Sequence, residues 1–397
     1  MLEEIADNVG TPVYVYDGAV FRARIARLEA ALAGVRHQLC YAVKANDCLA
    51  LLRIAAEEGV GADIVSGGEL AKALRAGIRP DRIFFSGVGK TRAEIRAALE
   101  AGIRSLNVES LGELDVVADE ARSLARAAPI SIRLNPDVTP ATHEYVSTGS
   151  GASKFGLAPA DVLAAYRRAA SEPALEPVGL SFHVGSQLLD PAPVLAAADR
   201  AAELWREAAR EGIELEELDC GGGLGVPYTA GGGPDVDAYG RAVGEVAASL
   251  GARLVLEPGR WLVAPAGTFV TRVLYVKEAR DRRVAVCDGG MNDLVRPALY
   301  EAYHPIAVVG GDERARGIVD VVGPVCESGD FFALGRELPL PEPGDLLAVG
   351  LAGAYGRVMS STYNGRPLCP EVLVEEEGWR VVRERGSFAD LVRGELA

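Results

Sequence analysis

Positive charge, histidine and paired cysteines are all scarce in this chain, and each shortage argues against a class of protein. Lys and Arg number 41 against 56 Asp and Glu, so the formal net charge is −15. A surface that binds nucleic acid should be basic, so we expect no nucleic-acid partner. The chain has four histidines and six cysteines without a CxxC pair. We therefore expect no metal site and reduced thiols.

Long apolar segments are also missing. No uninterrupted apolar run has the length of a membrane span, and the first ten residues, MLEEIADNVG, lack the basic-then-apolar pattern of a signal peptide. These features predict a cytoplasmic protein with no membrane partner. Hydrophobic residues make up 49% and charged residues 24% of the 397 residues, which is an ordinary soluble composition. The length exceeds that of one typical core, so we expect one large domain and one smaller domain.

From about residue 37 to 260, short strand-like segments alternate with longer segments of helical periodicity. The strand-like segments number eight: QLCYAVK, GADIVS, RIFFSG, SLNVES, ISIRLNP, VGLSFHVGS, ELDCGGG and RLVLEPGR. This repetition predicts an α/β fold, a parallel (β/α)8 barrel. Beyond residue 260, strand-like segments are separated by Gly- and Pro-rich connections. We predict a barrel domain over residues 11–260 and a β-rich domain over residues 261–397, which residues 1–10 could adjoin.

Polar and glycine residues occupy the C-terminal ends of the predicted strands, where barrels of this kind carry their chemistry. In chain order these are Lys44, Asp63, Arg133, His183, glycines 221–223 and the segment Glu257–Arg260. Taken alone, Lys44 would most simply be a lysine that has reached water where its strand ends. As a member of this set, Lys44 is predicted to point into the mouth of the barrel, where all the strands end.

Two of these strand ends suit an anion. Loops after the seventh and eighth strands of barrels often bind phosphate, and glycines let backbone N–H groups approach it closely. Gly222, Gly223 and Gly259 meet this condition, and Ser186 in HVGS adds a hydroxyl. A glycine triplet is more often a structural turn, but its position after the seventh strand favours a phosphate site.

A lysine amine, a phosphate site and a carboxylate together suit pyridoxal 5'-phosphate. Lys44 would form a Schiff base with the cofactor aldehyde, and Glu257 would keep the pyridine nitrogen protonated. His183 could stack on the ring, while Asp63 and Arg133 could order the surrounding hydrogen bonds. The simpler alternatives are a core histidine at position 183 and a structural ion pair between Asp63 and Arg133.

The order of motifs resembles a known family. YAVKAN, DIVSGGEL, FSGVGK, NVES, RLNPDV, SKFG, HVGSQ, GGGLG, EPGR, MNDLVRPALY, CESGD and GAYG occur in the order found in fold-type III pyridoxal-phosphate decarboxylases. Within that group the chain is similar to the diaminopimelate decarboxylase family, over about residues 11–374. The resemblance implies that Lys44 carries the cofactor and that Gly222, Gly223 and Glu257–Arg260 hold it.

The resemblance also implies a homodimer whose active sites are shared between subunits. It implies that Cys326 in CESGD reaches the neighbouring active site as proton donor, and that Tyr355 in GAYG contacts both phosphate and substrate. The simpler alternative for Cys326 is a small buried hydrophobic residue.

Substrate choice depends on the groups that meet the distal end of the substrate. Arg260, Arg296 and Tyr300 suit a carboxylate, since arginine pairs with carboxylates through two hydrogen bonds, and Glu327 could bind an ammonium group. A distal amino-acid group carries both charges, as in meso-2,6-diaminopimelate. Its decarboxylation gives L-lysine and CO2 in the last step of lysine biosynthesis. Arg296 could instead be an ordinary surface arginine.

Four other functions remain open. A sibling decarboxylase acting on D-ornithine, lysine or a carrier-bound glutamyl group would share almost every motif. A racemase of similar fold would pair the pyridine nitrogen with arginine, which Glu257 argues against. A lysine aldolase would need no cofactor, and a non-catalytic regulatory homologue should have lost Lys44 or Cys326. Whether the polar loop 137–156 closes over substrate is also left open.

Overall fold

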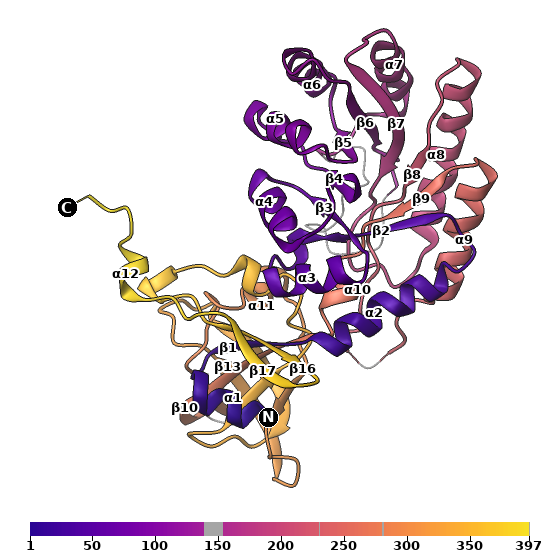
Figure 1. Ribbon diagram of the computed structural model, residues 1–397. Coiled ribbons are helices and arrows are strands. Elements are labelled where there is room, and N and C mark those ends of the chain that lie inside the picture. Colours follow the sequence, from indigo (N-terminus) through magenta and orange to yellow (C-terminus); the bar gives the residue numbers. More distant parts are fainter. Residues whose placement is uncertain (139–153, 230, 280–281, 397) are drawn as a thin grey trace. The chain divides into compact units, whose positions relative to one another are not determined.

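The chain divides into two compact units in the computed structural model, which describes residues 1–138, 154–229, 231–279 and 282–396 (Figure 1). The barrel unit comprises Arg22–Val226 and Gly232–Trp261. The β unit comprises Met1–Phe21, Pro227–Gly231 and Leu262–Ala397. Among the described helices, none is both long enough and apolar enough to cross a membrane.

The barrel unit is built on a closed ring of parallel strands that follow one another in chain order, from β2 to β9. The strands are β2 (His37–Ala42), β3 (Gly61–Ile64), β4 (Ile83–Phe85), β5 (Ser105–Val108), β6 (Ala128–Leu134), β7 (Leu175–Phe182), β8 (Glu217–Asp219) and β9 (Arg253–Leu256). Pairing of β9 with β2 closes the ring. This architecture confirms the predicted (β/α)8 barrel.

Helices follow the strands and form the outer layer of the barrel unit (Figure 1). They are α2 (Gly18–Ala31), α3 (Leu49–Glu57), α4 (Gly67–Ala76), α5 (Arg92–Ala101), α6 (Leu111–Ser123), α7 (Pro159–Ala170), α8 (Ala192–Arg210), α9 (Val236–Ser249) and the short α10 (Arg260–Val263). Two of them begin directly after the barrel mouth on a serine cap: Ser66 Oγ accepts from Glu69 N at 3.2 Å, and Ser110 Oγ accepts from Glu113 N at 3.1 Å. Such caps stabilise a helix start by about 1 kcal/mol each, so they keep the mouth loops short and ordered.

A cluster of ion pairs holds the N-terminal end of the barrel, opposite the mouth. Glu217, the first residue of β8, is 2% exposed. Its Oε1 accepts from Arg104 Nε at 2.9 Å and also from Arg253, the first residue of β9. Arg104 reaches out to Glu216 as well, with NH2 to Oε2 at 2.6 Å. One buried carboxylate therefore joins the segments that begin β5, β8 and β9.

The β unit is a mixed sheet whose main path runs β14-β13-β11-β10-β1-β16-β17, with β15 paired to β10 and β12 paired to β15. Its strands are β1 (Val13–Asp17), β10 (Gly267–Ala279), β11 (Arg282–Cys287), β12 (Ile306–Val308), β13 (Arg316–Val322), β14 (Phe331–Pro339), β15 (Leu346–Val349), β16 (Glu371–Glu375) and β17 (Gly378–Arg383). Its helices are α1 (Leu2–Val9), α11 (Arg296–Tyr300) and α12 (Phe388–Leu391). The predicted β-rich character of this part of the chain is confirmed.

Strand β1 lies in this sheet and not in the barrel, with which the sequence pattern had grouped residues 11–21. It pairs antiparallel with β10 and parallel with β16. The apolar side chains of β1 explain its place in this sheet. Val13 and Val15 pack in one buried cluster with Ile5 of α1, Val270 of β10 and Val372 of β16.

Candidate active site

A polar pocket lies within the barrel unit where the strands end. Its lining residues are Lys44, Ser86, Asn107, Arg133, Ser181, Phe182, His183, Asp219 and Glu257. Four of these, Lys44, Arg133, His183 and Glu257, were predicted from strand ends in the sequence. The free space among these side chains is only about 20 Å³, because side chains fill the interior of such barrels. These groups therefore form the floor of a site, not a closed cavity.

Lys44 lies in a turn of 3-10 helix, η1 (Val43–Ala45), that directly follows β2. Its Nζ donates to Asp63 Oδ2 at 2.5 Å, and Asp63 is fully buried. Asp63 occupies the neighbouring strand β3, in register with Ala42. A buried carboxylate at this distance stabilises the charged ammonium and fixes its position. The lysine at the end of the first strand thus points into the mouth.

Glu257 and Asp219 form a buried carboxyl pair at the ends of β9 and β8. Burial, followed by the charges of Asp219 and Asp63, raises the pKa of Glu257 well above its ordinary value. Burial also raises the pKa of Asp219, whose side chain hydrogen-bonds to that of Glu257. Two carboxyl groups in such contact retain a proton between them. Glu257 Oε1 is buried and has no hydrogen-bond partner among the described residues.

The glycines after β8 bind tightly to this carboxyl pair. Gly221 N donates to Asp219 Oδ1 at 2.8 Å, and Glu257 N donates to Gly221 O at 2.8 Å. A Cβ on Gly222 would lie 2.3 Å from Glu257 O, so a larger residue cannot take this path. Glycine at position 222 is therefore required by close backbone approach, and the loop presents main chain instead of side chains.

The imidazole of His183 is held by the same loop. Gly222 N donates to His183 Nδ1 at 3.2 Å, so Nδ1 carries no proton in this arrangement. Burial, with smaller effects of Lys44 and Arg133, lowers the pKa of His183 well below its ordinary value. The ring is therefore neutral, and the glycine loop holds it at the pocket.

The remaining predicted residues of the barrel unit have definite partners. Arg133 NH1 donates to Glu109 Oε1 at 2.7 Å, so the alternative of an ion pair between Asp63 and Arg133 does not form. Arg260 donates to Ser186 Oγ from Nε at 3.2 Å and from NH2 at 3.1 Å. Gly259 packs so closely that a Cβ there would lie 2.9 Å from Ala45 Cβ, beside Lys44.

Five predicted residues belong to the β unit. Cys326 and Glu327 are exposed, and Cys326 N donates to Asn364 Oδ1 at 3.0 Å. The alternative of a buried structural cysteine is therefore wrong. Tyr355 has a left-handed backbone with φ of 55°.

Arg296 and Tyr300 are the first and last residues of α11. Arg296 is 5% exposed, so the alternative of an ordinary surface arginine is also wrong. Its NH1 donates to Tyr228 Oη at 3.0 Å and contacts His304 Nε2 at 2.9 Å.

Sequence patterns missed five residues of the pocket floor: Ser86, Asn107, Ser181, Phe182 and Asp219. Asn107 Nδ2 donates to Ser86 Oγ at 3.0 Å and to Asp219 Oδ2 at 3.3 Å, which extends the network around the carboxyl pair. Asp219 could have been found, because it directly precedes the glycine triplet at a strand end. The question of loop 137–156 concerns mainly residues 139–153, which lie outside the described residues.

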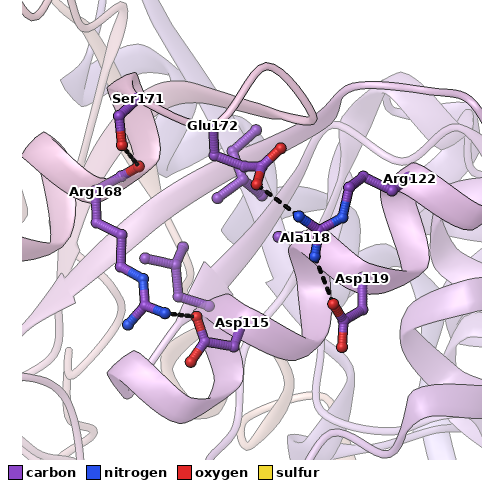
Figure 2. Close-up of a pocket in the computed structure, with 9 residues that line it drawn as sticks. Asp115, Ala118, Asp119, Arg122, Arg168, Ser171 and Glu172 are labelled. Atoms are coloured by element: carbon purple, nitrogen blue, oxygen red, sulfur yellow. Dashed lines mark hydrogen bonds and ion pairs between the residues drawn. The ribbon is translucent and has the colours of Figure 1, made fainter.

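A larger hollow of about 400 Å³ lies on the outer layer of the barrel unit, beside α6 and α7 (Figure 2). Its charged side chains neutralise one another: Arg122 bonds to Asp119 at 2.5 Å and to Glu172 at 2.8 Å, and Arg168 bonds to Asp115 (Figure 2). No predicted site residue lines it. We assign the chemistry to the smaller pocket, because reactive groups converge there. Nowhere in the described parts of the chain do three His, Cys, Asp or Glu side chains cluster as metal ligands.

Comparison with known proteins agrees with this geometry. Residues 19–264 match the family model described as pyridoxal-dependent decarboxylase, pyridoxal binding domain. The chain is 48% identical to diaminopimelate decarboxylase of Pseudomonas fluorescens, over 99% of this chain and 95% of that protein. It is 45% identical to the enzyme of that name from Zymomonas mobilis, over 99% and 94% of the two chains.

A solved structure extends the similarity to three dimensions. Diaminopimelate decarboxylase from Helicobacter pylori, complexed with L-lysine, superposes with a TM-score of 0.96 at 41% identity, covering 99% of this chain and 98% of that one. The similarity spans both units of the fold. The chain belongs to the pyridoxal-dependent decarboxylase family and, within it, to the diaminopimelate decarboxylases.

Proposed function

We propose that this chain decarboxylates meso-2,6-diaminopimelate to L-lysine and CO2 with pyridoxal phosphate, in the last step of lysine biosynthesis. The observation that carries the proposal is the pocket floor. There a charged lysine, a buried carboxyl oxygen without a partner among the described groups and a close-packed glycine loop converge. The family of the chain supports both the cofactor and the reaction, and the lysine bound to the related Helicobacter enzyme supports the product.

The residues present fit this cofactor. Glu257 Oε1 is a buried acceptor that lacks a donor among the described residues, and such groups normally have one. A protonated pyridine nitrogen would supply that donor. Lys44 would hold the cofactor aldehyde through its amine, and the neutral ring of His183 could lie against the pyridine face. When bound, the cofactor supplies an electron sink for the pair of electrons released when the Cα–carboxylate bond breaks.

The groups assigned to the phosphate are main-chain N–H groups and hydroxyls. Gly223 and Gly259 are assigned main-chain N–H groups, and Gly222, whose own N–H donates to His183 Nδ1, lets the backbone pass close to the site. Ser186 Oγ accepts from Arg260, so the serine hydroxyl keeps its hydrogen for an anion. Tyr355 is assigned to phosphate and substrate together. These donors would stabilise the phosphate by hydrogen bonds.

Asp63 and Arg133 act on the site through their neighbours. Asp63 accepts from the Lys44 ammonium and keeps the amine at the strand end, where it would hold the cofactor aldehyde. Arg133 lines the pocket, and its ion pair with Glu109 holds it there. Both roles require buried partners, which the two ion pairs provide.

Cys326 is assigned as the acid that protonates Cα after CO2 has left. An exposed position is unusual for a group that must deliver one proton to one carbon, since water would compete. We therefore propose that the working site is covered by a second copy of the chain, which makes the enzyme a homodimer with shared sites.

Exposed apolar side chains at the barrel mouth support this dimer. Val65, Val88 and Leu111 follow β3, β4 and β5 and are 37%, 42% and 37% exposed. Exposed apolar side chains after three successive strands mark a surface that another chain covers. Size-exclusion chromatography with light scattering should give a dimer mass, and a monomer that is fully active would refute shared sites.

The substrate's distal group is assigned to Arg260, Arg296, Tyr300, Tyr355 and Glu327. Two buried guanidinium groups suit its carboxylate, and the exposed carboxylate of Glu327 suits its ammonium. A simple diamine would leave these arginines opposite an amine, so the set favours a substrate with a distal amino-acid group. We place the reaction in the cytoplasm, which cell fractionation can test.

The decisive experiment combines purified protein, pyridoxal phosphate and meso-diaminopimelate. Lysine and CO2 should form in equal amounts, and L- and D-ornithine or lysine should turn over far more slowly. Faster turnover of those amino acids would establish a sibling decarboxylase, and racemised substrate without CO2 would establish a racemase. In Lys44→Ala, both turnover and the visible absorption of the bound cofactor should disappear. Turnover that persists in this variant would exclude the lysine assignment.

A further inference from the structure

Arg296 is the centre of a small buried cluster in the β unit. Its NH1 lies 3.0 Å from Tyr228 Oη and 2.9 Å from His304 Nε2, and its guanidinium carbon lies 4.9 Å from the centre of the Tyr228 ring. The rings of Tyr228 and His304 meet edge to face at 5.3 Å between centroids. Two residues from different segments of the chain, Tyr228 and His304, therefore enclose the guanidinium of Arg296.

The hydrogen bonds of His304 define its proton. His304 is fully buried, and its Nδ1 lies 2.9 Å from the carbonyl oxygen of Gly350. A carbonyl oxygen can only accept, so Nδ1 carries the hydrogen. Nε2 then accepts from Arg296 NH1, since arginine can only donate. In this arrangement the imidazole is neutral and acts as a bridge from the main chain at Gly350 to the guanidinium.

We propose that His304 is a positioning residue for substrate recognition, holding the Arg296 guanidinium in the orientation that pairs with the distal carboxylate. This inference rests on the proposed function, in which Arg296 binds that carboxylate. A two-bond pair between arginine and a carboxylate requires a fixed guanidinium plane. Supporting hydrogen bonds behind a binding group commonly set such a plane.

The chemistry of the imidazole suits this task better than a purely apolar filler would. A leucine at position 304 would leave both Gly350 O and one N–H of Arg296 without these partners, and the guanidinium could rotate on its flexible stem. Tyr228 supplies a second acceptor and a ring face for the same group. The cluster thus restrains the cation from two sides without adding a carboxylate that would compete with the substrate.

Two ligands separate this role from a merely structural one. L-Lysine carries the distal carboxylate after the reaction, whereas cadaverine is lysine without that group. Inhibition constants for both would be measured on holoenzyme turning over meso-diaminopimelate, for wild type, His304→Leu and His304→Gln. Glutamine preserves an acceptor for Arg296, and leucine does not.

In His304→Leu, the inhibition constant of L-lysine and the KM for diaminopimelate should rise about tenfold or more, the effect of losing one charge-assisted hydrogen bond. The inhibition constant of cadaverine and kcat should change less than about twofold. His304→Gln should recover most of the loss. Equal weakening of both ligands, or no weakening of lysine, would overturn the positioning role.

A second variant covers the case in which His304→Leu does not fold. Tyr228→Phe removes only the hydroxyl that accepts from Arg296 and should weaken L-lysine severalfold while leaving cadaverine unchanged. Unchanged lysine inhibition in Tyr228→Phe, against a large loss in Arg296→Ala, would refute the cluster's role. If wild type released no CO2 from diaminopimelate, or Arg296→Ala bound lysine normally, the failure would instead lie with the proposed function.

Discussion

Replacing Glu217 by alanine should destabilise the barrel strongly without changing its chemistry. Glu217 lies at the N-terminal end of the barrel, away from the strand ends that carry the pocket. Its carboxylate is 3% exposed and joins Arg104 and Arg253, whose side chains are 24% and 30% exposed. Removal of the carboxylate leaves two partly buried guanidinium groups facing each other without it.

The expected magnitude follows from these exposures. Breaking a buried ion pair costs about 3–5 kcal/mol, and the partial exposure of the arginines favours the lower end, about 3 kcal/mol. In a unit of this size each kcal/mol lowers Tm by about 2–4 °C, so Tm should fall by about 6–12 °C. Thermal unfolding of the holoenzyme, followed by circular dichroism, measures this shift. At 25 °C, kcat and KM should equal those of wild type.

The neighbouring residue provides a matched control. Glu216 pairs with the same Arg104 at 2.6 Å, but its side chain is 69% exposed. A surface ion pair contributes about 1 kcal/mol at most, so Glu216→Ala should lower Tm by no more than about 4 °C. If the two variants unfolded at the same temperature, burial would not be the property that makes Glu217 important, and the reasoning would fail.

Three further predictions concern the chemistry and its pH dependence. Cys326→Ala should keep the visible absorption of bound cofactor but slow kcat by at least about a hundredfold, because the acid that protonates Cα is gone; unaltered kcat would remove that role. Arg296→Ala should raise KM for diaminopimelate by about a hundredfold and affect cadaverine inhibition little, and an unaltered KM would contradict the distal-carboxylate assignment. Burial raises the pKa of Glu69 to about 7, so the folded chain keeps a proton that the unfolded chain loses between about pH 4.5 and 7, and stability falls across that range. Glu69→Gln should therefore be about 3 kcal/mol more stable than wild type in urea unfolding at pH 8 and equal to it near pH 4; a pH-independent difference would exclude Glu69 as the source.

The pocket floor was predictable, because in a (β/α)8 barrel the order of the strands along the chain is also their order around the barrel. Once alternating strands and helices are recognised, the C-terminal ends of all strands must meet at one mouth, and Lys44, His183 and Glu257 follow. The contacts among them were less accessible. Asp63 could pair with Lys44 or Arg133, and only the register of β3 beside β2 places it with the lysine.

Residues of the β unit were harder to predict, because nothing in sequence spacing links them. Arg296 and His304 lie in one connection, between β11 and β12, whereas Tyr228 comes from another segment, and its contact with them depends on how the two segments cross. The motif RPALY made Arg296 a candidate, but its burial and its two partners required coordinates. Strand β1 was misplaced for a similar reason: VYVYD reads as a strand in any sheet, and its partners lie hundreds of residues away.

The position of β1 has a consequence for biosynthesis of the protein. It lies between β10 and β16, so about 350 residues separate the end of β1 from the start of its C-terminal neighbour. At typical rates of translation, the ribosome needs about 20–70 s to make that interval. The barrel strands and β10 are complete well before then, whereas the edge of β1 that pairs with β16 waits for its partner. The sheet can therefore close around β1 only after residues 371–375 have been made, and not when the barrel emerges.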